Sequence, residues 1–120
     1  MDNYMIRVLL GDSVYSKPLG QITQADFEKA RDTVREMIVF PHGKLQAWGP
    51  SLARCYLNWE ATGEKDYMRN GNRSRNVQVQ LDRFGEDGLE ELLELNKFDM
   101  ALYAFGLARA EMLFTACEER

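Results

Sequence analysis

Near the N-terminus, apolar residues recur every three or four positions, which is the spacing of one face of an α-helix. This first set is Tyr4, Met5, Val8 and Leu9, with Gly11 after it. Glycine readily takes the backbone conformation that ends a helix. We therefore expect a short helix, followed by a turn-rich connection through Pro18 and Gly20.

A second helix is predicted to begin after Thr23. The Thr23 side chain can accept from an amide of the first turn, and Asp26 takes the place of the usual glutamate in a capping box. The apolar positions that follow are Phe27, Ala30, Val34 and Met37 or Ile38. Their spacing predicts an amphipathic helix of about four turns.

The middle of the chain predicts one strand and a third helix. Residues 37–40 form an unbroken apolar run that Pro41 ends, which is typical of a buried strand. Residues 50–59 suit a helix with Pro50 in its first turn. The apolar face of this helix would hold Leu52, Cys55, Tyr56 and Trp59.

After residue 63 the periodicity lapses until residue 82, and residues 69–75 are expected to form an exposed loop. Residues 77–79 alternate apolar and polar positions, which allows a second, short extended segment. The last third is strongly helical, with Asn96 separating two helices. Asn96 or Asp99 is expected to cap the second of them.

Composition describes an ordinary globular chain: 120 residues, of which 45% are hydrophobic and 28% charged. We expect a single domain over residues 1–120, mainly α with one or two short strands. The net charge of −4 argues against a dedicated nucleic-acid binder. No uninterrupted apolar run approaches the roughly 20 residues of a membrane span, so the chain as written is expected to be soluble.

The usual sequence signals of catalysis are missing. His42 is the only histidine, and no glycine-rich phosphate-binding motif is present. Cys55 and Cys117 lack neighbours that would hold a metal, and we interpret them as buried thiols rather than as a disulfide. We therefore predict no catalytic residue and no metal ligand.

One cluster is chemically suggestive. Arg69, Arg73, Ser74 and Arg75 are interleaved with asparagine and glycine. Arginine binds phosphate and sulfate oxygens in pairs, and neighbouring polar groups add donors. Both interpretations remain open: an anion or cofactor site, or a solvated surface.

Three stretches, in this order, resemble the carbohydrate sulfotransferases of the heparan-modifying and Golgi membrane-associated type. Residues 2–11 resemble a segment in which an asparagine, an arginine and a Leu-Gly close a helix. Residues 22–39 are similar to the next helix, which leads into a strand of the central sheet. Residues 92–114 resemble the closing helix, whose ending N-x-x-D-x-x-L-Y matches Asn96, Asp99, Leu102 and Tyr103.

The resemblance covers only the C-terminal half of that family's P-loop-like α/β fold. The family transfers a sulfuryl group from 3'-phosphoadenosine 5'-phosphosulfate (PAPS) to a sugar hydroxyl, and its nucleotide-binding and catalytic residues precede the matched part. The resemblance therefore implies a sulfotransferase-like domain without autonomous catalysis, with PAPS as the family's cofactor. It implies the Golgi lumen if the chain is a fragment of such an enzyme.

Two alternatives stay open: a truncated fragment of an active sulfotransferase, or a non-enzymatic interaction or structural subunit of a larger assembly. In each case we expect a partner, because a lone strand leaves its backbone groups unpaired along both edges. The partner would be another protein chain or a second copy of this one.

Overall fold

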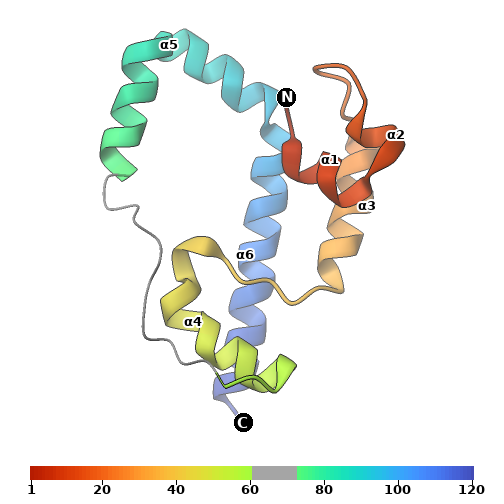
Figure 1. Ribbon diagram of the computed structural model, residues 1–120, viewed down its shortest axis with the longest axis vertical. Coiled ribbons are helices and arrows are strands. Elements are labelled where there is room, and N and C mark those ends of the chain that lie inside the picture. The colour runs from red at the N-terminus through yellow and green to blue at the C-terminus, as the bar shows by residue number, and fades with distance from the viewer. Residues whose placement is uncertain (61–72) are drawn as a thin grey trace.

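The computed structural model describes residues 1–60 and 73–120, with side chains described for all of these except residues 73–81 and 84 (Figure 1). The elements are α1 (Tyr4–Leu10), α2 (Asp12–Tyr15), α3 (Gln24–Arg35), the 3-10 turn η1 (His42–Lys44), α4 (Leu45–Leu52), the π-helical turn η2 (Ala53–Leu57), α5 (Arg73–Leu95) and α6 (Lys97–Glu118). The described residues are mainly helical and contain no strand. The mainly α class is confirmed, whereas the one or two strands predicted beside it are wrong for these residues.

Helix α6 is the common support of the fold. In Figure 1, α1, α2 and α3 lie on one side of it and α4 on the other. The buried core joins α6 to the N-terminal helices and consists of Ile6, Val14, Ile22, Ala30, Val34 and Leu102. The Phe27 ring stacks on that of Phe98, with 6.0 Å between ring centroids. The hydrophobic side of α3 therefore faces α6.

Helix α1 and the start of α3 form as the pattern predicts, whereas the short helix α2 occupies part of the segment that was expected to be a turn-rich connection. Helix α1 ends at Gly11, whose φ of 72° glycine adopts without strain. Before α3, the Thr23 hydroxyl accepts from the Asp26 amide at 3.2 Å, and the Asp26 carboxylate accepts from the Thr23 amide at 3.0 Å. This reciprocal pair is the predicted capping box.

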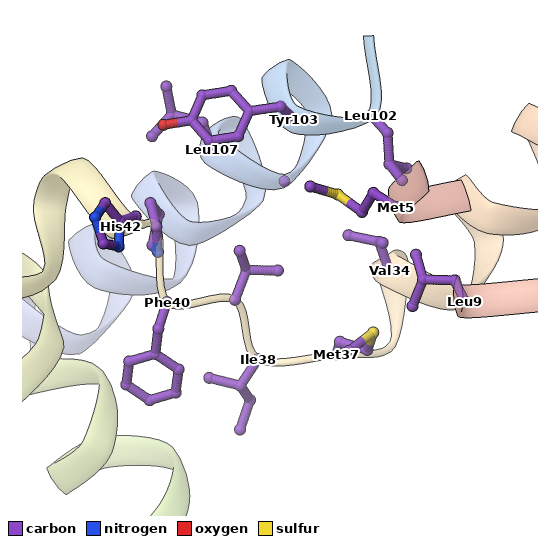
Figure 2. Close-up of a pocket in the computed structure, with 13 residues that line it drawn as sticks. Met5, Leu9, Val34, Met37, Ile38, Phe40, His42, Leu102, Tyr103 and Leu107 are labelled. Carbon is purple, nitrogen blue, oxygen red and sulfur yellow. The ribbon is translucent and has the colours of Figure 1, made fainter. Parts of the chain in front are cut away.

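The predicted strand at residues 37–40 is wrong as regular structure. The segment is an irregular connection that runs from α3 to η1 (Figure 2), and no neighbouring strand exists among the described residues to pair with it. The second extended candidate, residues 77–79, is part of α5. Alternation over three residues is too short to separate the period of a strand from that of a helix.

Helix α4 corrects two further expectations. It begins at Leu45, so Pro50 lies inside the helix instead of in its first turn. Cys55, in the turn η2, forms a disulfide with Cys117 of α6, with 6.0 Å between their Cα atoms. The interpretation as free thiols is therefore wrong. The pairing depends on α4 packing against the C-terminal part of α6, a contact that sequence spacing does not reveal.

Helix α5 extends away from the other helices in Figure 1 and is interrupted at Gly85. It contains residues 73–75, which the sequence pattern had assigned to a loop.

By length and composition alone, helix α6 is long and apolar enough to cross a membrane. Its most apolar stretch of 18 residues has a mean hydropathy of 1.2, and 22% of that stretch is buried. The core helix of a soluble protein, which is mostly buried, passes the same test. The apolar run went unrecognised in the sequence because Arg109 and Glu111 interrupt it.

Candidate functional site

A groove of about 400 Å³ lies between α1, the connection after α3, and α6 (Figure 2). Its lining residues are Met5, Leu9, Val34, Met37, Ile38, Val39, Phe40, Pro41, His42, Leu102, Tyr103, Gly106 and Leu107. Met5, Met37 and Tyr103 remain 43%, 42% and 44% exposed. Only His42 and Tyr103 bring polar side-chain atoms to it. The groove therefore favours an apolar occupant over a charged one.

The backbone of residues 38–40 runs along one wall of this groove without hydrogen-bond partners. Within the described part of the chain, no hydrogen bond joins their amides or carbonyls to another group. Next to them, the Met37 carbonyl accepts from Nε of Arg109 at 2.7 Å. An unpaired extended segment can accept a further strand, because each residue offers one donor and one acceptor.

Gly106 of α6 brings this segment close to the helix. A Cβ atom at Gly106 would lie 3.6 Å from Cγ1 of Val39, which is ordinary contact distance. Val39 therefore packs almost on the helix backbone. The segment is held on α6 without forming a sheet.

The opposite wall is held in place by two helices that cap each other. The Asp99 carboxylate of α6 accepts from the amides of Met5 and Ile6, at 2.8 and 3.0 Å. In return, Oδ1 of Asn3 accepts from the Asp99 amide at 2.9 Å. These bonds satisfy amides at the start of both helices, which have no partner within their own helix.

Asn96 joins the same network. Its Oδ1 atom accepts from the Asn3 amide at 2.9 Å, and the Asn3 side chain donates to the Leu95 carbonyl at 2.8 Å. Either Asn96 or Asp99 was expected to cap α6 with its side chain, and Asn96 does occupy the N-cap position, but it makes no side-chain capping bond there. That expectation is wrong: Asn3 caps α6, whereas Asp99 caps α1.

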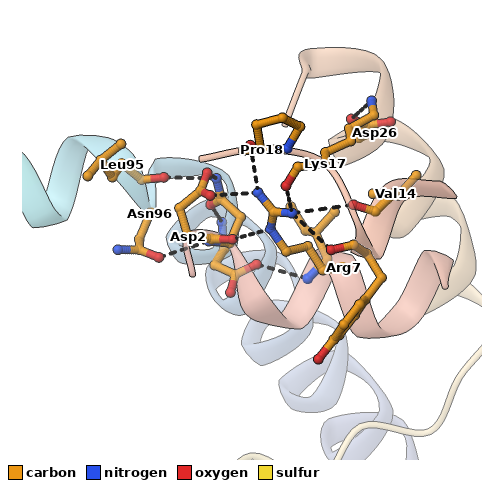
Figure 3. Close-up of polar contacts among 12 residues, drawn as sticks. Asp2, Arg7, Val14, Lys17, Pro18, Asp26, Leu95 and Asn96 are labelled. Carbon is orange, nitrogen blue, oxygen red and sulfur yellow. Dashed lines mark hydrogen bonds and ion pairs between the residues drawn. The ribbon is translucent and has the colours of Figure 1, made fainter. Parts of the chain in front are cut away.

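Arg7 is buried, with 1% of its surface exposed, and it holds the N-terminal residues and the segment after α2 together. It donates to Oδ1 of Asp2 at 2.6 Å and to the carbonyls of Val14, Tyr15, Lys17 and Pro18 (Figure 3). Burial by itself raises the pKa of Asp2, but the hydrogen bond from Arg7, a backbone amide and the Arg7 charge outweigh it. The net pKa is lowered, and the Arg7 guanidinium is fully engaged within the chain.

A similar pair anchors the start of α3. Nζ of Lys17 lies 2.7 Å from Oδ2 of Asp26. Burial raises the pKa of Asp26, yet the hydrogen bonds from Lys17 and Thr23 lower it overall. Both carboxylates are therefore held ionised by partners that also fix the loop between α2 and α3.

The bonds between distant segments in this network were not predicted from the sequence. Asn3, Arg7, Asn96 and Asp99 all belong to the stretches that carry the sulfotransferase resemblance. In the structure, Asn3, Asn96 and Asp99 join α1 to α6, and Arg7 joins α1 to the residues of α2 and the loop after it. The sequence signal for this network is the asparagine at the start of each helix, Asn3 before α1 and Asn96 before α6, because asparagine is a common N-cap residue.

The structure does not bring the predicted anion-site residues into a described site. Arg69 lies outside the described residues, and Arg73, Ser74 and Arg75 occupy the first turn of α5, where only the backbone is described. An anion site there stays a prediction. No group of three metal-binding side chains is found among the described residues.

Comparison of the chain with models of protein families, with curated proteins and with solved structures gives no match. The sulfotransferase resemblance therefore rests on the three stretches alone.

Proposed function

We propose that this chain is a sulfotransferase-like domain that has no catalysis of its own and works by binding another polypeptide in the apolar groove. The bound segment is extended and pairs with residues 38–40. The observation that carries this proposal is the unpaired backbone of that segment along the wall of the groove.

Strand addition suits both features of the groove. Backbone hydrogen bonds to residues 38–40 would supply affinity, and alternate side chains of the added strand would enter the apolar hollow. The exposed side chains of Met5, Met37 and Tyr103 would be removed from water at the same time. A small polar substrate would use neither feature.

The resemblance suggests which polypeptide this is. In the sulfotransferase family, the strand after the second stretch belongs to a sheet whose other strands come from the nucleotide-binding half. The partner we propose is therefore a polypeptide with a free sheet edge of that kind, and any PAPS would bind to the partner. The Cys55–Cys117 disulfide supports an oxidising compartment, such as the Golgi lumen of the family enzymes.

The test uses the separately expressed nucleotide-binding half of a heparan-type carbohydrate sulfotransferase as the probe. We expect a one-to-one complex by calorimetry and size-exclusion chromatography. Val39→Pro removes a backbone donor and should weaken binding at least about tenfold, which corresponds to about 1.4 kcal/mol. Val39→Ala keeps the donor and is the matched control.

A second variant guards against misfolding of the proline substitution. Met37→Glu places a charge at the groove, at a side chain that is already 42% exposed, so the helices should remain intact by circular dichroism. It should also weaken the complex. Absence of any complex at tens of micromolar, or equal binding by native protein and both groove variants, would contradict the proposal.

A further inference from the structure

Helix α6 carries a second surface that shares no residue with the groove. We call it the outer face of α6, and its residues are Lys97, Ala101, Ala104, Ala108, Met112 and Glu119. They recur at three- and four-residue spacing, except for the last interval of seven, so they lie on one side of the helix, with Glu119 as its C-cap residue in helical backbone conformation. All six are exposed, and Met112 is 58% exposed. As far as the described residues show, a long apolar helix is thus left uncovered along one side.

We propose that two copies of this chain associate through the outer face, with their α6 helices antiparallel and Ala108 on the two-fold axis. Charge is the first argument for this arrangement. Lys97 precedes Ala108 by eleven residues, and Glu119 follows it by eleven. Antiparallel pairing about Ala108 therefore places each lysine opposite the partner copy's glutamate, whereas parallel pairing would place like charges together.

Shape is the second argument. Met112 follows Ala108 by four residues and Ala104 precedes it by four. In the antiparallel pair, each Met112 side chain therefore lies over Ala104 of the other copy, between its Ala101 and Ala108. A flexible large side chain facing three small ones is the pattern of a knob in a hole.

The other charges near this face are compatible with the pair. Lys97 also lies 3.1 Å from Glu94, but both side chains are more than half exposed, and such pairs are weak enough to exchange partners. The two Glu111 side chains would lie six positions apart along the axis, about 9 Å, so they do not meet. In a bilayer, by contrast, exposed Glu111 would face lipid, which is unfavourable. A protein surface is therefore the better occupant.

Sedimentation velocity across micromolar concentrations tests the proposal with a charge exchange. We expect a monomer–dimer equilibrium in the native protein. Lys97→Glu and Glu119→Lys should each weaken the dimer about fivefold, because each creates two like-charge contacts. The double variant should restore the native dimerisation constant, which a general loss of folding would not do.

The register is tested separately by cross-linking. Ala108→Cys places two thiols at the two-fold axis and should give a covalent dimer under mild oxidation. Thr33→Cys, at an exposed position of α3, is the control and should not give a covalent dimer. The groove variant Met37→Glu should dimerise like native protein, so this proposal can fail independently of the proposed function.

Three results would overturn the proposal. These are a strictly monomeric native chain, a dimer that is indifferent to the charge exchange, and flotation of the chain with phosphatidylcholine–phosphatidylserine vesicles in place of dimerisation. The last result would assign the outer face to a membrane surface.

Discussion

Asn3 shows how much of the fold depends on a single side chain. It has left-handed backbone angles, with φ at 47° and ψ at 50°, and is 2% exposed. Asparagine tolerates this conformation better than most residues do. Its Oδ1 atom accepts from the Asp99 amide and so caps α6, its backbone amide donates to Oδ1 of Asn96, and its side-chain amide donates to the Leu95 carbonyl. Backbone strain and helix capping are thereby joined at one position.

The first prediction concerns Asp99, whose side chain caps α1 while Asn3 caps α6. Asp99→Ala removes the acceptor for two amides at the start of α1, so the protein should lose about 1–2 kcal/mol of unfolding free energy. Urea unfolding measures the loss. Asp32→Ala, which breaks an exposed ion pair with Arg35, is the matched control and should change stability by less than about 0.5 kcal/mol. Equal effects of the two substitutions would show that Asp99 does not cap α1.

The second prediction concerns acid stability. The pKa values of Asp2 and Asp26 are lowered in the folded chain from 3.8, so folding favours their ionised forms. This contribution is fully present above the unfolded pKa of 3.8, and it is lost as the pH falls through the lower folded values. The unfolding midpoint in urea should therefore stay level above about pH 5 and fall steadily below pH 4.

A variant of the ion pair isolates one part of that loss. Lys17→Met removes the cation beside Asp26, so the variant should lose less stability than native protein between pH 4 and pH 2. Arg35→Met removes an exposed cation and should follow the native curve in that range. If Lys17→Met retains the full acid dependence, the Lys17–Asp26 pair is not its source.

At the scale of the elements, local signals predicted α1 and the start of α3 correctly, but not the short helix α2. The glycine after α1 and the Thr23–Asp26 capping box act within a few residues, so the sequence contains all that is needed to recognise them. Helix α6 was predicted for the same reason, from the spacing of its apolar residues. Its cap was misassigned because Asn3 lies more than ninety residues away in the sequence.

The errors share a physical cause. A strand at residues 37–40 requires a neighbour, and among the described residues none supplies one. The Cys55–Cys117 disulfide requires α4 to pack on α6, and the groove requires α1 and α6 to be placed relative to each other. Each feature depends on contacts between distant segments, and hydrophobic periodicity reports only on the segment itself.

The disulfide gives the third prediction. It links positions 62 residues apart, and the chain-entropy model assigns such a loop about 4 kcal/mol of stabilisation. A Cys55→Ser, Cys117→Ser double variant should therefore lose about 2–4 kcal/mol of unfolding free energy. Amide exchange should quicken mainly in α4 and η2, whereas the core of α1 and α3 keeps its protection. Uniform quickening across all helices would contradict this division.

At the scale of the whole molecule, α6 has three distinct sides. One packs against α1 and α3, one against α4, and the remaining side is exposed. The groove lies where the first of these sides meets residues 37–41. Among the described residues, the fold therefore leaves two apolar surfaces exposed, the groove and the outer face of α6.

The fourth prediction follows from the extent of the sulfotransferase resemblance, which does not include the family's nucleotide-binding and catalytic residues. Positioning and electrostatic stabilisation of the transferred group supply most of the rate enhancement in such reactions. The isolated chain should therefore give no sulfated product from PAPS and a panel of polysaccharides above a no-protein control. Turnover that a substitution in this chain abolishes would contradict a non-catalytic role.

The central claim is that residues 38–40 form an open edge for a strand from another polypeptide. Amide hydrogen exchange of this segment, with and without the nucleotide-binding half of a heparan-type sulfotransferase, tests it most directly. The account predicts fast exchange at Ile38, Val39 and Phe40 in the isolated chain and marked protection in the complex, with the α3 amides unchanged. Slow exchange in the isolated chain, or fast exchange that persists in a formed complex, would contradict it.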